Sequence, residues 1–141
     1  MEARMKEWIV AYLKHKDVIR KSITSIEEKD DHVLVTYKDG KELALVVSHL
    51  DDAPAVLKRL GKHTERAVLL VTLNTKKNLS ALIAHWKQFA ALKTLKVFFI
   101  NPDTQGEQKW IIAPYVHNSI ADSASLRSGL ASLAEQVPFA D

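Results

Sequence analysis

The stretch from Asp31 to His49 constrains the fold most, because it has the pattern of a β-hairpin with a defined turn. Asp39 and Gly40 both tolerate the positive φ that a two-residue type I′ turn requires. Strands are therefore predicted over residues 32–38 and 41–48. A two-residue turn also sets the register of the strands that it joins.

Pairing outward from this turn places Asp31 opposite Ser48 and Val33 opposite Val46. Directly paired residues share a face of the sheet, so Asp31, Val46 and Ser48 are predicted to lie together. Apolar residues occupy both faces, which predicts a central hairpin covered on both sides. The two predicted apolar sets are Val33, Val35, Ala44 and Val46 on one face, and Leu34, Leu43, Leu45 and Val47 on the other.

The rest of the chain alternates helical and strand patterns. Helices are predicted over residues 3–20, from Asp52 to Gly61, from Asn74 or Thr75 to about residue 90, and from Asp122 or Ser123 to Pro138. Further strands are predicted over residues 23–28, 68–73, 96–100 and 110–113. This order predicts an α/β fold with a mixed central sheet flanked by helices, formed by residues 1–141 as a single domain.

Composition narrows the class of protein. Hydrophobic residues make up 47% and charged residues 26% of 141 residues, enough for one sizeable core. The absence of cysteine excludes disulfides and zinc–thiolate sites. Since no apolar run approaches the twenty residues of a membrane span, we expect a soluble cytoplasmic protein with no membrane association and no cofactor.

Positive charge gathers in the middle of the chain. Residues 48–100 carry nine basic and three acidic groups, a net charge of +6. Lys76 and Lys77 fall in the first turn of a predicted helix, where free backbone N–H groups favour an anion. A duplex nucleic-acid backbone is the expected ligand, although an ordinary solvated surface also explains these residues. The candidate contacts are Lys58, Arg59, Lys62, Arg66, Lys76, Lys77 and Lys87.

Aromatic and histidine residues point to packing more than to chemistry. Trp8, Trp86 and Trp110 fall on apolar stripes or strands and are predicted to be core residues, which leaves no stacking platform for single strands. His117 has no identifiable partner and is also assigned to packing. The predicted hairpin brings His32, His49 and Asp30 near one another, which allows a metal site there, but a solvated hairpin end is the preferred interpretation.

The first half of the chain resembles the PD-(D/E)xK nuclease superfamily, most closely the archaeal Holliday-junction resolvases. The resemblance covers roughly residues 5–75 and rests on the order helix, strand, hairpin. The family pattern has a glutamate on the first helix, an aspartate opening the second strand and Glu-x-Lys on the third. Glu7 and Asp31 stand at the first two positions, whereas Val46, Val47 and Ser48 stand where Glu-x-Lys would be.

The resemblance implies a restriction-endonuclease-like core whose metal chemistry has been lost. Valine supplies no oxygen ligand for Mg²⁺, and serine cannot replace the charge of lysine. No catalytic or metal-binding residue is therefore predicted. The implied function is nucleic-acid binding or scaffolding, in a DNA repair or recombination setting, with a homodimer or a protein partner as further expectations. Two alternatives stay open, namely a protein-interaction module and an active nuclease with relocated catalytic residues.

Overall fold

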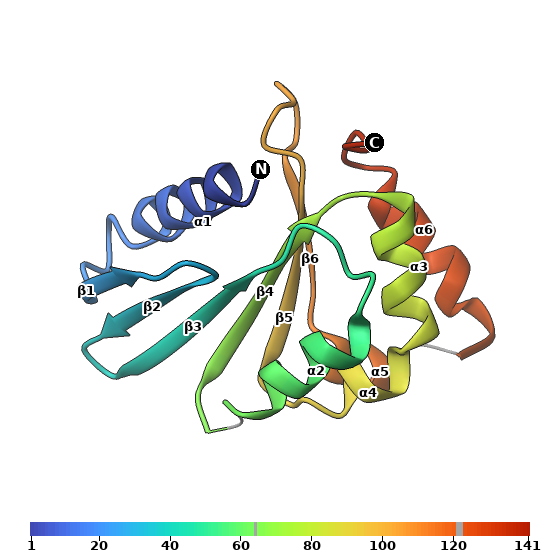
Figure 1. Cartoon of the computed structure of the whole chain (residues 1–141), viewed down its shortest axis with the longest axis horizontal. Coiled ribbons are helices and arrows are strands. Elements are labelled where there is room, and N and C mark those ends of the chain that lie inside the picture. The colour runs from blue at the N-terminus through green and yellow to red at the C-terminus, as the bar shows by residue number, and fades with distance from the viewer. Residues whose placement is uncertain (64, 121–122) are drawn as a thin grey trace.

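A six-stranded mixed sheet lies at the centre of the computed structural model, which describes residues 1–63, 65–120 and 123–141 (Figure 1). The strands follow one another across the sheet in chain order. They are β1 (Ile23–Glu28), β2 (His32–Tyr37), β3 (Gly40–Val46), β4 (Ala67–Leu73), β5 (Leu95–Ile100) and β6 (Lys109–Ile112). The predicted α/β class with a mixed sheet flanked by helices is confirmed.

Strand direction divides the sheet into three parts. The first three strands form an antiparallel meander, β3, β4 and β5 run parallel, and β6 returns antiparallel to β5. Residues Val68 to Leu73 of β4 are all buried, as expected for a strand that is covered on both faces.

The helices cover the two faces unequally (Figure 1). Among the described helices, the amphipathic helix α1 (Glu2–Lys16) is the one that packs on one face, where Met5 and Ile9 contact the apolar side chains of β2–β5. The opposite core contains Phe89, Phe99 and Leu130. The elements on that face are α2 (Ala53–Gly61), α3 (Lys76–Ala84), α4 (Trp86–Ala90), α5 (Pro114–Ile120), the 3₁₀ turn Ser123–Ser125 and α6 (Leu126–Ala134).

The hairpin forms where predicted, but its register is two residues away from the predicted one. Tyr37 pairs with Gly40 and Val33 with Ala44, so Lys38 and Asp39 make the turn. Among the non-glycine residues that the structure describes, Lys21 is the one with a positive φ, so Lys38 and Asp39 both have negative φ. A type I′ turn needs positive φ at both central residues, and this turn is therefore of another type.

A slip of two residues keeps every strand side chain on its predicted face. Val33 and Ala44 do pack against α1, and Leu45 joins the opposite core. The hairpin is not fully covered on both sides, however, because Leu34 is half-buried rather than buried.

The first helix ends earlier than predicted. It stops at Lys16, and both carboxylate oxygens of Asp17 then accept backbone N–H groups, those of Ser22 and Ile23, each at 2.9 Å. These bonds hold the chain in a turn, and Ile19, which the predicted helix over residues 3–20 would include, is 92% exposed.

Two of the predicted helix starts are confirmed by their caps. The Asp52 carboxylate accepts the Ala55 N–H, and the Thr75 hydroxyl accepts the Asn78 N–H. The long helix predicted from residue 75 is interrupted at His85, yet Leu82 before the break and Trp86 after it are both buried in the same core.

The end of the chain departs furthest from prediction. α5 was not predicted: no helix was expected between the strand at residues 110–113 and the last helix, whereas Pro114 begins one directly after β6. Asp122, one of the two predicted caps of the last helix, lies outside the described residues. The other, Ser123, opens the short 3₁₀ turn before α6.

Candidate functional site

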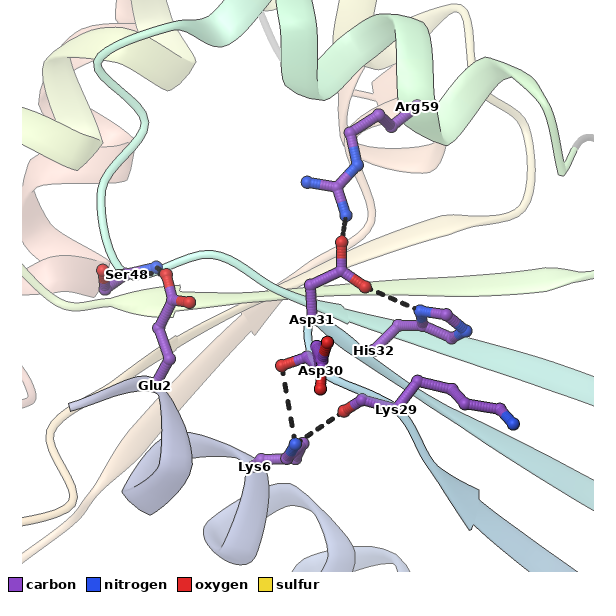
Figure 2. A network of polar contacts seen from close by, with 8 residues as sticks. All are labelled: Glu2, Lys6, Lys29, Asp30, Asp31, His32, Ser48 and Arg59. Atoms are coloured by element: carbon purple, nitrogen blue, oxygen red, sulfur yellow. Dashed lines mark hydrogen bonds and ion pairs between the residues drawn. The ribbon is translucent and has the colours of Figure 1, made fainter.

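Asp31 joins the hairpin to α2 at the place where the resemblance puts a catalytic aspartate (Figure 2). One carboxylate oxygen forms an ion pair with Arg59 Nη2 of α2. The other lies 2.8 Å from His32 Nδ1, which donates because an ionised carboxylate only accepts. The hydrogen bond from His32 and the charge of Arg59 hold the pKa of Asp31 below its usual range, although partial burial opposes them.

The other candidate positions of the nuclease motif lie against α1. Val46 is 2% exposed within the apolar cluster that contains Met5 and Ile9. The backbone N–H and the hydroxyl of Ser48 both donate to Glu2 Oε2 at 3.1 Å. Figure 2 shows Glu2 and Ser48 on the α1 side and the Asp31 carboxylate directed toward α2.

The prediction that Asp31, Val46 and Ser48 share one face is therefore wrong. Backbone pairing does bring Asp31 beside Val46, because the Val46 N–H donates to the Asp31 carbonyl at 2.9 Å. Asp31 precedes β2, however, and strand alternation does not fix the direction of its side chain. Its carboxylate turns to the guanidinium of Arg59 instead.

Glu2, and not Glu7, is the helix carboxylate that reaches the end of β3. Glu7, which stands at the helix position of the family pattern, is exposed. The first turn of α1 lies beside Ser48 (Figure 2), so a residue in that turn makes the contact. Lys6, one turn further on, donates to the Lys29 carbonyl at 2.6 Å.

A groove of about 240 Å³ opens between α2 and the hairpin, and we call it the α2 groove. Its polar lining brings histidines and cations around a single carboxylate. The residues that line it are Asp31, His32, Leu43, Leu45, Arg59, Lys62 and His63. Of these, Arg59 and Lys62 were predicted ligand contacts. His63 was not predicted, and His32 was considered only beside His49 and Asp30. No local pattern relates His32 to His63, because the register of the hairpin and the position of α2 bring them together.

The seven predicted basic contacts occupy several places in the fold. Lys58, Arg59 and Lys62 belong to α2 or its end, and Lys87 lies on α4. Arg66 precedes β4, whereas Lys76 and Lys77 follow it at the start of α3. A strand of this length separates its ends by roughly 20 Å. Within the predicted set, only Arg59 and Lys62 line the α2 groove.

The tryptophans divide into two groups. Trp86 and Trp110 are 7% and 5% exposed, which confirms their prediction as core residues. Trp8 is half-buried, so its assignment to the core is wrong in part. Its ring stacks on Tyr12 with centroids 5.3 Å apart, and its Nε1 donates to Gln108 Oε1 at 2.9 Å.

The remaining histidine candidates have packing roles or open surroundings. The His117 ring packs edge-on against Trp86 with centroids 5.6 Å apart, as expected for a structural residue. His49 is exposed. Within residues 1–63, 65–120 and 123–141, no group of three His, Asp, Glu or Cys side chains is placed to hold a metal ion. His32, His49 and Asp30 therefore do not form a metal site.

Comparison of the chain with models of known families, with curated proteins and with solved structures gave no match. Over the described parts of the chain, none of the helices has the length and apolar character needed to cross a membrane.

Proposed function

We propose that this chain is a catalytically degenerate nuclease-like protein with a restriction-endonuclease-like core, and that it binds nucleic acid through phosphate contacts. The order helix, three-strand meander, helix, strand supports the relationship, because it runs in the sequence that the resemblance implies. Asp31 directly before β2 and Val46 and Ser48 at the end of β3 supply the matching positions.

One observation carries the proposal that cutting has been lost: the Asp31 carboxylate is paired with the guanidinium of Arg59. A metal site would need that carboxylate together with a second oxygen ligand. Val46 offers none, and the hydroxyl of Ser48 is engaged by Glu2. The other polar residues that line the α2 groove with Asp31 carry cationic or imidazole groups, which suit phosphate contact better than phosphate cleavage.

We expect the purified protein to show no Mg²⁺- or Mn²⁺-dependent cleavage of duplex or branched DNA. The physical reason is the replacement of a carboxylate and a lysine by Val46 and Ser48. The measurement is gel analysis of labelled duplex and four-way-junction substrates over several hours. Cleavage that disappears in an Asp31→Ala variant would contradict the expectation, and it would favour the active nuclease with relocated residues.

Duplex binding tests the second half of the proposal. Lys76 and Lys77 are exposed in the first turn of α3, where free N–H groups favour an anion. Replacing both with alanine is expected to weaken binding to all duplex sequences alike. The slope of log K against log salt should become shallower by about one to two units, since each phosphate contact contributes roughly 0.9.

Fluorescence anisotropy of labelled duplexes at several salt concentrations provides the measurement. Lys38→Ala with Lys41→Ala is the matched control, because it removes two exposed lysines from the hairpin. Equal affinities of the wild type and the Lys76/Lys77 variant would show that these two lysines do not contact the duplex. No duplex binding by the wild type at low salt would overturn the nucleic-acid role.

The alternative function, a protein-interaction module, is favoured by one further observation. Ile111 on β6 and Tyr115 and Val116 on α5 are large apolar residues that are 38%, 44% and 53% exposed. Tyr115 and Val116 are neighbours on α5, and exposed large apolar side chains of this kind are available for contact with another protein. This alternative gains support if duplex binding fails.

A further inference from the structure

The α2 groove concentrates positive charge around one small space. Arg59 and Lys62 carry permanent charges, and His32 and His63 add two imidazole groups. Asp31 is the one acid among the lining residues, and its charge is offset by its ion pair with Arg59. The groove is therefore net positive even with both histidines neutral, which favours an anionic ligand.

Asp31 positions two of these groups. It accepts a hydrogen bond from His32 and pairs with Arg59, so both side chains are held by one carboxylate. A guanidinium has five N–H donors in a fixed fork, and the ion pair engages one Nη atom. The remaining donors match the geometry of a phosphate group, which arginine binds in a bidentate manner.

The floor of the groove strengthens such an interaction. Leu43 and Leu45 line it and are 4% and 3% exposed. Apolar walls lower the local dielectric, so charges in the groove attract an anion more strongly than the same charges on an open surface. The volume of about 240 Å³ leaves room for a group of the size of a phosphate.

We propose that the α2 groove binds a phosphate group of a polynucleotide, with Lys62 and His63 as ligand contacts and Asp31 as the residue that positions Arg59 and His32. The proposal rests on the proposed nucleic-acid role. It differs from that role in assigning one defined site on α2 rather than a distributed basic surface. The phosphate is either an internal diester or a terminal monoester, and the two share the same recognition chemistry.

The test compares two matched double variants. Lys62→Ala with His63→Ala removes an adjacent lysine–histidine pair from the groove. Lys14→Ala with His15→Ala removes the same pair of residue types from the exposed side of α1, on the opposite face of the sheet. Since these side chains are exposed or half-buried, both variants should keep the wild-type unfolding temperature within a few degrees.

Affinity for duplex DNA is measured by anisotropy against salt, with and without a 5′-phosphate on the duplex. We expect the groove variant to bind about fivefold or more weakly and to lose about one unit of salt slope, while the α1 variant changes less than about twofold. A loss confined to the 5′-phosphorylated duplex assigns the terminal monoester. A loss shared by both duplexes assigns the internal diester.

Groove and α1 variants that bind equally well would overturn the groove assignment and leave the proposed nucleic-acid role in place. Absence of duplex binding by the wild type would overturn both. A titration with inorganic phosphate, followed through the histidine ring resonances, gives a second readout. Shifts at His32 and His63 with none at His85 are expected, whereas equal shifts at all three would contradict a specific phosphate site.

Discussion

Replacing Val46 with glutamate is expected to lower the free energy of unfolding by about 3–5 kcal/mol. Val46 is 2% exposed and packs in the cluster beneath α1, so the substitution removes apolar burial and places a carboxyl group where water is excluded. Urea denaturation followed by circular dichroism measures the change. The buried carboxyl should also favour its protonated form, so the loss should be greater at pH 8 than at pH 5.

Lys41→Glu is the matched control, because Lys41 is exposed on the same strand. It should change the free energy of unfolding by no more than about 0.5 kcal/mol. A Val46→Glu variant as stable as this control would contradict the packing of α1 on the end of β3. It would also mean that a carboxylate can be placed there, making Val46→Glu with Ser48→Lys a sensible variant to test for activity.

The expected loss connects the stability of the fold with the proposed loss of catalysis. In the nuclease pattern, the position of Val46 carries a carboxylate that needs water or a metal beside it. In this chain the same position is part of the hydrophobic core. If the proposed relationship to the nucleases holds, metal binding at this position would require α1 to move away from β3, and not only a change of one side chain.

The hairpin shows how far local patterns could predict this fold. Alternation of apolar residues correctly assigned the side chains of Val33 and Ala44 to one face and Leu45 to the other. The same alternation is satisfied by registers two residues apart, because both preserve the faces. The two registers differ only in which dipeptide makes the turn. Asp39-Gly40 has the stronger intrinsic turn preference, but Lys38-Asp39 is the dipeptide that forms the turn.

The site was harder to predict than the fold, because its contacts join distant parts of the chain. Asp31 and Arg59 are 28 residues apart, and Glu2 and Ser48 are 46 apart. Each pair forms because a helix packs on a particular part of the sheet. Residue types alone indicated that basic residues are abundant in the middle of the chain. They did not show that Arg59 would be paired with the candidate aspartate.

A buried asparagine sets the path of the chain between β3 and α2. Asn78 is 1% exposed, and its Oδ1 accepts the Leu50 N–H at 2.8 Å. Its Nδ2 donates to the carbonyls of Ser48 and Leu73, each at 2.9 Å, and to the Thr72 hydroxyl at 3.0 Å. One side chain thus ties α3 to the ends of β3 and β4.

Asn78→Ala is expected to lower the free energy of unfolding by about 2–4 kcal/mol, because it leaves the buried Leu50 N–H and the Thr72 hydroxyl without this partner. The measurement is again urea denaturation, with Ser80→Ala, an exposed site on the same helix, as the control for helix propensity. The control should change stability by less than about 0.5 kcal/mol. A loss below about 1 kcal/mol in Asn78→Ala would mean that other groups satisfy the freed partners.

The consequence of Asn78→Ala should extend to the α2 groove. The segment that Asn78 holds, from Ser48 to Leu50, leads directly into α2, which carries Arg59. A looser connection lets α2 shift against the hairpin, so the ion pair between Arg59 and Asp31 should be populated less. Duplex affinity should then fall in the folded variant by more than in Ser80→Ala. Unchanged affinity in a clearly destabilised Asn78→Ala protein would show that α2 keeps its place through its apolar contacts, among them Val56 and Leu60.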